Sequence, residues 1–184
     1  MAVYVSPQAF TLVFYDAAEI ARVAGQVAAA IGLSGDLSIA IDETSPLARI
    51  RAKSDGDAWV VTADSGAFED TKMPRQFSAD ATALALGRVL LRAKDRVDGG
   101  FGEAPADDDL TLAQSAAWDV YAIGRVHRLG YPINEQRWRY NYRNRHGFTD
   151  VTDETFDDVL NATGLTWGQL DAISQKGITN TTTV

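Results

Sequence analysis

Residues 36–63 read DLSIAIDETSPLARIRAKSDGDAWVVTA and define the expected architecture. Apolar and polar residues alternate along three parts of this stretch, as they do in half-buried β-strands. Between the second and third parts, Asp55-Gly56 is typical of a two-residue hairpin turn. The sequence therefore predicts a small mixed or antiparallel sheet whose apolar side chains point to one face. Its strands are expected at 36–42, 47–53 and 58–63.

The segments on either side of this stretch predict one more strand and two helices. Residues 10–15 (FTLVFY) are aromatic and β-branched, which favours a strand. Asp16 then has the position of a helix N-cap, and apolar residues at helical spacing follow it through 16–32. A longer helix is expected over 78–97, after a loop at 64–77. The predicted fold class is α+β, with the sheet of the N-terminal half packed on these two helices.

The second half of the chain has the pattern of short helices. Gly, Pro and Asp concentrate in residues 99–109, which indicates a linker. Thr111 is followed three residues later by Gln114, as at a helix N-terminus, and Asn134 is expected to cap the next helix. Two more helices are expected at 153–162 and 167–175. The expected organisation is an α+β core over 1–98, the linker, a helical subdomain over 110–178 packed on the core as one compact domain, and a flexible tail over 179–184.

Composition excludes several classes of protein. The chain of 184 residues contains no cysteine, so disulfides, thiolate zinc sites and cysteine nucleophiles are excluded. The formal net charge of −8 argues against a protein that coats nucleic acid over its whole surface. No apolar run approaches the roughly 18 residues that span a bilayer, and the cytoplasm is the expected location. Arginine outnumbers lysine 13 to 4, a usage that favours a bacterial or phage origin.

One segment has the opposite charge from the rest of the chain. Residues 118–147 contain six arginines against two carboxylates, a formal charge of +4, together with several Trp and Tyr side chains. Arginine guanidinium groups donate in pairs to phosphates and carboxylates, and aromatic rings offer stacking surfaces. We therefore expect a non-catalytic binding or assembly function, in which an acidic or mixed protein partner, or a second copy of the chain, docks on this surface. The expected contact residues are Trp118, Tyr121, Arg125, Arg128, Trp138, Arg139, Tyr142, Arg143 and Arg145.

Two other interpretations of the same segment remain open. The aromatic residues can pack on the core while the arginines pair with this chain's own carboxylates, notably those at 107–109 and 150–158. Alternatively, the segment can bind the phosphates of a nucleic acid locally, which a steep loss of affinity with salt would reveal. An external binding surface predicts that changing Arg139, Arg143 and Arg145 together to Glu removes binding and leaves the fold intact.

Residues that carry hydrolytic or metal chemistry are sparse. The chain has two histidines, His127 and His146; neither belongs to an HExxH motif, and no metal or cofactor site is expected. His127 falls on the apolar side of its helix, which favours a hydrogen-bonded core residue over a catalytic base. The remaining enzymatic interpretation is a hydrolase in which acidic residues and His127 converge only in the folded chain.

The order of the elements resembles that of a known family. A strand, a helix, three strands and a long helix follow one another, and this order is similar to the core of zincin-type metallopeptidases. In that family the long helix carries HExxH, whereas residues 81–97 here read ATALALGRVLLRAKDRV and contain neither histidine nor glutamate. The resemblance thus implies a zincin-like fold without its zinc site, and the peptidase activity is not carried over.

Overall fold

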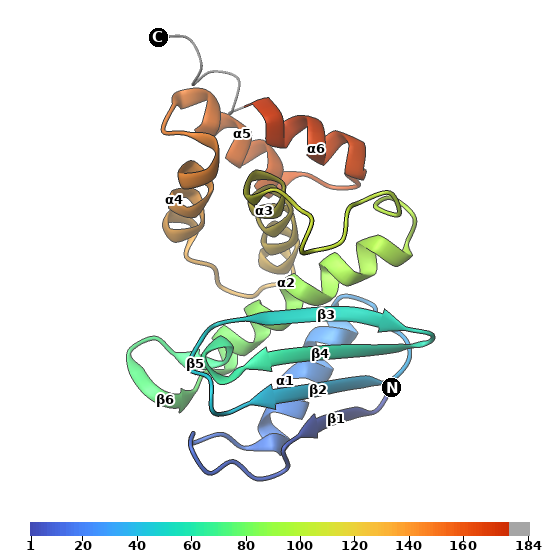
Figure 1. Ribbon diagram of the computed structural model, residues 1–184, viewed down its shortest axis with the longest axis vertical. Helices are drawn as coiled ribbons and strands as arrows, with labels where there is room; N and C mark the ends of the chain where they lie inside the picture. The colour runs from blue at the N-terminus through green and yellow to red at the C-terminus, as the bar shows by residue number, and fades with distance from the viewer. Residues whose placement is uncertain (177–184) are drawn as a thin grey trace. The chain divides into compact units, whose positions relative to one another are not determined.

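Four strands form one sheet in the first part of the chain (Figure 1). β1, β2 and β4 are parallel neighbours, and β3 pairs antiparallel with the other side of β4. The computed structural model describes residues 1–176, in which a second, two-stranded sheet and six α-helices complete the fold, so the predicted α+β class is confirmed. In their order across the sheet, the four strands are β1 (Val3–Ser6), β2 (Leu37–Asp42), β4 (Ala58–Asp64) and β3 (Ile50–Asp55).

The predicted alternation of residues sets which face of this sheet is buried. Every second residue of β2 and β4 is apolar and buried, and the residues between them are exposed or half-buried; the buried ones are Leu37, Ile39 and Ile41 of β2 and Trp59, Val61 and Ala63 of β4. The β3–β4 hairpin closes at the pair Asp55 and Ala58, with Gly56 in the left-handed conformation (φ 60°) that such tight turns require. The strands expected at 36–42 and 58–63 are confirmed, and the strand between them begins later than expected.

Two helices begin at side chains that cap them. The carboxylate of Asp16 accepts a backbone N–H of α1 (Ala17–Ala30), whose apolar stripe is buried. In Figure 1, α1 lies behind the sheet, against its buried face. The hydroxyl of Ser78 accepts a backbone N–H of α2 (Ala79–Val97). The two helices predicted over 16–32 and 78–97 are therefore confirmed.

The strand predicted at 10–15 is wrong, because this segment directs its backbone hydrogen bonds elsewhere. The N–H groups of Thr11 and Leu12 both donate to the carboxylate of Glu43, each at 2.7 Å. These donors cannot also join a strand ladder. The first strand is instead the four-residue β1, which pairs with β2.

The loop predicted at 64–77 contains regular elements, so that prediction is also wrong. A short 3-10 turn, η1 (Ser65–Ala67), leads into a second sheet made of β5 (Glu69–Asp70) and β6 (Met73–Phe77). Four of the five β6 residues are exposed, and one of them is Pro74. A strand with one buried position at most leaves no alternating pattern in the sequence.

The chain divides into two compact units, Met1–Lys94 and a second one that begins at Asp95. The second unit is helical, and capping residues set its helix starts. Thr111 and Gln114 form a reciprocal capping box, and Asn134 caps the next helix, as predicted. The helices are α3 (Leu112–Arg128), α4 (Glu135–His146), α5 (Asp150–Asn161) and α6 (Trp167–Lys176).

The start of α5 differs from the prediction by three residues. Its N-cap is Thr149, whose Oγ1 accepts the backbone N–H of Thr152. Thr152 itself is buried, and its hydroxyl donates to the carbonyl oxygen of His146, the last residue of α4. This contact fixes the end of α4 against the first turn of α5.

α3 is the central helix of the second unit, because α4, α5 and α6 all pack against it. At Gly124 a Cβ atom would lie 1.9 Å from the carbonyl oxygen of Leu160 on α5, so this close approach requires glycine. Farther along α3, Trp118 is fully buried and stacks on Phe101, with ring centroids 4.7 Å apart. Phe101 belongs to the glycine-rich segment expected to be a linker, so part of that segment is packed against α3.

Three expectations concern membrane-spanning segments, the C-terminal tail and the domain boundaries. Within residues 1–176, no helix has the length and the apolar character needed to cross a membrane. The tail expected over 179–184 lies outside the described residues. The proposed domain boundaries at 98 and 109 stay predictions.

Gly124 provides a test of the α3–α5 contact. We expect Gly124→Ala to lower the free energy of unfolding by about 1–3 kcal/mol, because its Cβ would overlap the α5 backbone. Gly168→Ala is the matched control, since a Cβ there meets no atom within 4 Å. Urea unfolding followed by circular dichroism measures both. Equal stability of the two variants would contradict the close contact.

Candidate functional site

Three of the aromatic residues expected on the binding surface are buried instead. Trp118, Tyr121 and Tyr142 are each exposed by 3% or less. Trp118 and Tyr121 stack on Phe101, and Tyr142 stacks on His146 with ring centroids 3.8 Å apart. Their rings therefore serve the core of the second unit and cannot stack on an external partner.

Arg125 binds a buried carboxylate at the end of α2. Both terminal nitrogens of its guanidinium donate to Asp95, each at 2.7 Å, in the two-pronged geometry that favours an arginine–carboxylate pair. Trp118 Nε1 donates to the same carboxylate at 2.8 Å. The guanidinium also lies over the ring of Tyr121, 4.0 Å from its centroid. Arg125 is thus part of the interior of the unit.

Arg128 caps the C-terminal end of α5. Its guanidinium donates to the carbonyl oxygens of Leu160 and Ala162, at 2.8 and 2.7 Å. The last carbonyls of a helix have no partner within the helix, and the partial negative charge there favours a cation. Arg128 therefore holds α5 against α3.

Arg139 and Arg143 form a ladder of ion pairs between α4 and α5. Arg139 donates to Asp157 and Arg143 to Asp153, both from α4 to α5. The hydrogen bond from Arg143 holds the pKa of Asp153 below its ordinary value. Arg139 donates in addition to Glu135 on its own helix, at 2.8 Å. The interpretation that the arginines pair with carboxylates at 150–158 is therefore confirmed for these two.

Two of the six arginines keep their guanidinium groups unpaired. Among the described residues, the side chains of Arg137 and Arg145 make no hydrogen bond or ion pair, and both are exposed. The Glu triple substitution at 139, 143 and 145 would break the α4–α5 ladder as well as change the surface. The expectation that it leaves the fold intact is therefore at odds with the ladder.

Arg145 lines a groove between α3 and α4 that we call the α3–α4 groove. It has a volume of about 350 Å³. Four residues of the α3 wall are spaced i, i+3, i+4 and i+7 from Leu112, and four of the α4 wall have the same spacing from Trp138. The walls bring together three of the nine predicted contact residues, Trp138, Tyr142 and Arg145, with others that were not predicted. The lining residues are Leu112, Ser115, Ala116, Asp119 and Val120 from α3, and Trp138, Asn141, Tyr142, Asn144 and Arg145 from α4.

The α4 wall of this groove carries unsatisfied polar groups. In residues 1–176 the indole N–H of Trp138, the side-chain amides of Asn141 and Asn144, and the guanidinium of Arg145 make no hydrogen bond. Amide and guanidinium groups without internal partners can exchange water for a ligand at little cost. The two asparagines were not selected from the sequence, because only charged and aromatic side chains were considered. Asn141 follows Trp138 by three residues and Asn144 follows Asn141 by three, and this helical spacing was the signal that could have identified them.

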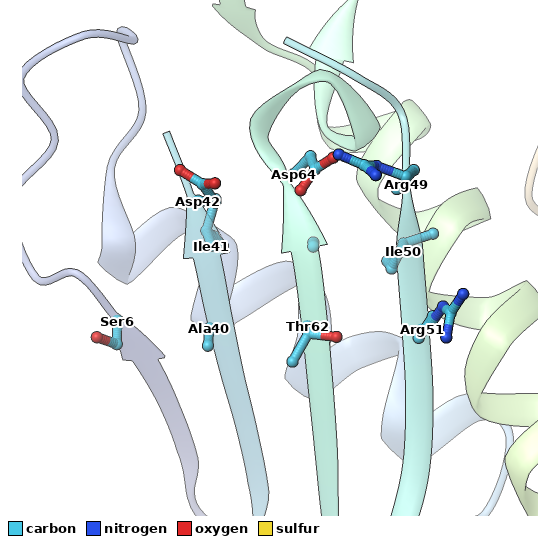
Figure 2. A pocket seen from close by; sticks show the side chains of 10 residues that line it. Ser6, Ala40, Ile41, Asp42, Arg49, Ile50, Arg51, Thr62 and Asp64 are labelled. Atoms are coloured by element: carbon cyan, nitrogen blue, oxygen red, sulfur yellow. The ribbon is translucent and has the colours of Figure 1, made fainter. Parts of the chain in front are cut away.

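A second hollow lies on the exposed face of the four-stranded sheet, and Figure 2 shows its lining side chains. It measures about 500 Å³ and is shallow, because Ser6, Ala40 and Thr62 are small. At its upper rim Asp42 and Asp64 end neighbouring strands. The ends of parallel strands are a common ligand position.

Both carboxylates of this hollow already have partners inside the unit. Asp42 accepts hydrogen bonds from the backbone and hydroxyl of Thr44, which hold its pKa below the ordinary value. Asp64 accepts from Ser45 and from Arg49, at 3.0 and 2.7 Å. No group of three metal-ligating side chains occurs in the described part of the chain. The α3–α4 groove is therefore the better candidate.

The two histidines occupy different environments, and that of His127 differs from the expected one. His127 is exposed, so its assignment to the core is wrong; its Nδ1 lies 3.2 Å from the carbonyl oxygen of Tyr131. His146 is the buried one, and burial lowers its pKa. Within residues 1–176 neither ring contacts a carboxylate by a hydrogen bond or ion pair. A hydrolase centred on His127 would need such a contact to orient the ring.

Comparison with known proteins adds no relative. No protein-family model, no curated protein and no solved structure matches this chain. The functional argument therefore depends on the groove and its chemistry.

Asp95 is the first site residue to test. We expect Asp95→Ala to lower the free energy of unfolding by about 2–4 kcal/mol, because it leaves the half-buried Arg125 guanidinium without its carboxylate. Asp109→Ala removes an exposed carboxylate with no ion pair among the described residues and should change stability by less than about 0.5 kcal/mol. Chemical unfolding measures the free energy of unfolding of both variants. A loss at Asp95 no larger than that of the control would contradict the proposed role of its carboxylate.

Asp153 makes the α4–α5 ladder sensitive to acid. Its pKa in the folded chain lies below the ordinary value of an aspartate, so its stabilising contribution is present above the ordinary pKa and is lost as the pH falls through the lowered one. Asp153→Asn should therefore lose less stability than the wild type between pH 7 and about pH 3. Urea midpoints at the two pH values measure this, with Asp109→Asn, at an exposed carboxylate outside the ladder, as the control that behaves like the wild type. Parallel losses in all three proteins would contradict the ladder.

Proposed function

We propose that this chain is a non-catalytic binding protein that holds a segment of a protein partner, acidic or mixed in charge, in the α3–α4 groove. The observation that carries the proposal is the set of unsatisfied polar groups on Trp138, Asn141, Asn144 and Arg145, which line one wall of the groove. Polar side chains without internal partners, gathered in a concave site, are typical of ligand recognition.

The chemistry of these groups fits a polypeptide. A side-chain amide presents one carbonyl and one N–H₂ group, so Asn141 and Asn144 can each pair with a peptide bond of the ligand. Arg145 suits a carboxylate of the ligand through two parallel hydrogen bonds. Trp138 and the exposed Leu112 supply apolar contact on opposite walls. Together they favour an extended segment that contains Asp or Glu.

The remaining arginines support this site indirectly. Arg125 binds Asp95, Arg128 fixes α5 to α3, and Arg139 and Arg143 fix α4 to α5. A wall that is held in place before the ligand arrives costs less ordering on binding. We therefore treat these four as positioning residues rather than contact residues.

Nucleic-acid binding is the weaker alternative for the same groove. Phosphate recognition needs several unpaired cations, and here four of the six arginines of the segment are engaged internally. Asp119 on the α3 wall adds a carboxylate to the site. The charge balance of the groove is thus close to neutral, which suits a peptide better than a polyanion.

The proposal is tested by selecting ligands from a library of random peptides displayed on phage, with the full chain as bait. We expect the selected peptides to contain an acidic residue, and Arg145→Glu to weaken their binding at least about tenfold because it reverses the charge that meets that residue. Fluorescence anisotropy of labelled peptides measures the affinity.

Arg137→Glu is the matched control, since Arg137 is also exposed and unpaired on α4 but does not line the groove. It should bind the peptides as the wild type does. Equal losses in both variants, or no peptide enriched over an Arg145→Glu bait, would contradict a peptide site. Tight binding of a mixed-sequence single-stranded DNA that collapses as salt rises would favour the alternative instead.

A further inference from the structure

The outer surface of α4 and α5 carries a second exposed feature, which meets the groove at Asn144. α3 packs on the inner sides of both helices, where Tyr142 and Phe156 are buried. Residues spaced i, i+3 and i+7 on the opposite sides are exposed and share one surface, which we call the α4–α5 face. They are Arg137, Tyr140 and Asn144 on α4, and Val151, Glu154 and Asp158 on α5.

Apolar side chains occupy one end of the α4–α5 face. Tyr140 is 58% exposed and Phe148, in the turn between the helices, is 62% exposed. Their rings meet edge to face with centroids 6.0 Å apart, and Val151 follows on the first turn of α5. Large apolar side chains that cluster in solvent mark a contact surface.

The charges of this face are separated by helix. Arg137 lies on α4, and Glu154 and Asp158 lie on α5; none of the three makes a hydrogen bond or ion pair through its side chain within residues 1–176. One helix therefore offers a cation and its neighbour offers carboxylates, all still hydrated. A surface that carries both signs in separate stripes is complementary to a second copy of itself.

The ion-pair ladder sets the heights of these charges along the two helices. Arg139 pairs with Asp157 and Arg143 with Asp153, so α4 and α5 run antiparallel, and Arg137 lies at about the level of Asp158. A two-fold axis parallel to the helices leaves the height of each residue along the axis unchanged. It sets α4 of one copy opposite α5 of the other. It would place Arg137 of each copy opposite Asp158 of the other.

We propose that two copies of this chain associate through the α4–α5 face, with α4 of each lying over α5 of the other. The Arg137–Asp158 contact then forms twice. Phe148 of each copy lies near the axis, and the apolar end of one face covers that of the other. Each patch meets its own symmetry mate, as a closed dimer requires. The face borders the groove at Asn144, whereas Arg137, Asp158 and Phe148 do not line the groove, so dimerisation and peptide binding can be measured separately.

Charge reversal tests this arrangement by sedimentation velocity on the full chain. The wild type should sediment as a dimer of the 19.9 kDa chain, while Arg137→Glu and Asp158→Arg should each raise the dimer dissociation constant at least about tenfold, because each puts like charges together at both contacts. The double variant, R137E with D158R, restores opposite charges and should dimerise again. An equimolar mixture of the two single variants should form heterodimers for the same reason.

Circular dichroism and thermal unfolding confirm that each variant is folded, as expected for two exposed residues without ion pairs. A wild type that stays monomeric up to about 1 mM overturns the proposal. So does a dimer that the single reversals leave intact, or one that neither the double variant nor the mixture restores. Peptide binding in the groove is measured separately and distinguishes failure of one proposal from failure of the other.

Discussion

The carboxylate of Asp95 organises the second unit of this protein. It accepts three hydrogen bonds from α3, two from Arg125 and one from Trp118, and so fixes the end of α2 to the central helix. Trp118 in turn packs against Phe101 and Trp167, which brings the preceding loop and α6 to the same helix. A buried charge that loses its partners is costly, so each of these contacts depends on the others. This arrangement positions α3, which forms one wall of the groove.

The segment that first suggested a binding surface has mainly a structural role. Its arginines were conspicuous because they reverse the sign of an acidic chain, and most of that charge is neutralised within the unit by Asp95, Asp153 and Asp157. What remains for a partner is a smaller and more selective set of groups. A site that combines amides, one guanidinium and one indole discriminates by geometry, because each group accepts few ligand atoms in few orientations.

Local signals in the sequence predicted most of the fold. Alternation identified β2 and β4, and the caps at Asp16, Thr111 and Asn134 identified three helix starts. These features depend on neighbouring residues, so the sequence displays them directly. The errors at 10–15 and 64–77 arose where the backbone binds a distant side chain or forms an exposed hairpin, for which neighbouring residues hold no information.

The site was harder to predict for the same reason. The sequence alone does not show whether the partner of an arginine is a carboxylate on the next helix or a ligand. Arg139 and Arg145 lie six residues apart and have opposite roles, because the first faces α5 and the second faces the groove. Helical periodicity assigns the two residues to different faces of α4. Which face packs against another helix depends on where α3 and α5 lie. Trp138 and Arg145 could be named from the sequence, whereas Asn141 and Asn144 needed the position of α3.

The edges of the four-stranded sheet have a consequence for solubility. In the first unit β1 and β3 are the edge strands, and a bare edge can pair with any other strand and so seed aggregates. β1 is four residues long and is followed at once by Pro7, which has no N–H to offer a ladder. β3 carries Arg51 and Lys53 at exposed positions, where bringing two such strands together would cost charge repulsion. The sheet of this unit is thus protected against uncontrolled growth by its shortest strand and by its most basic one.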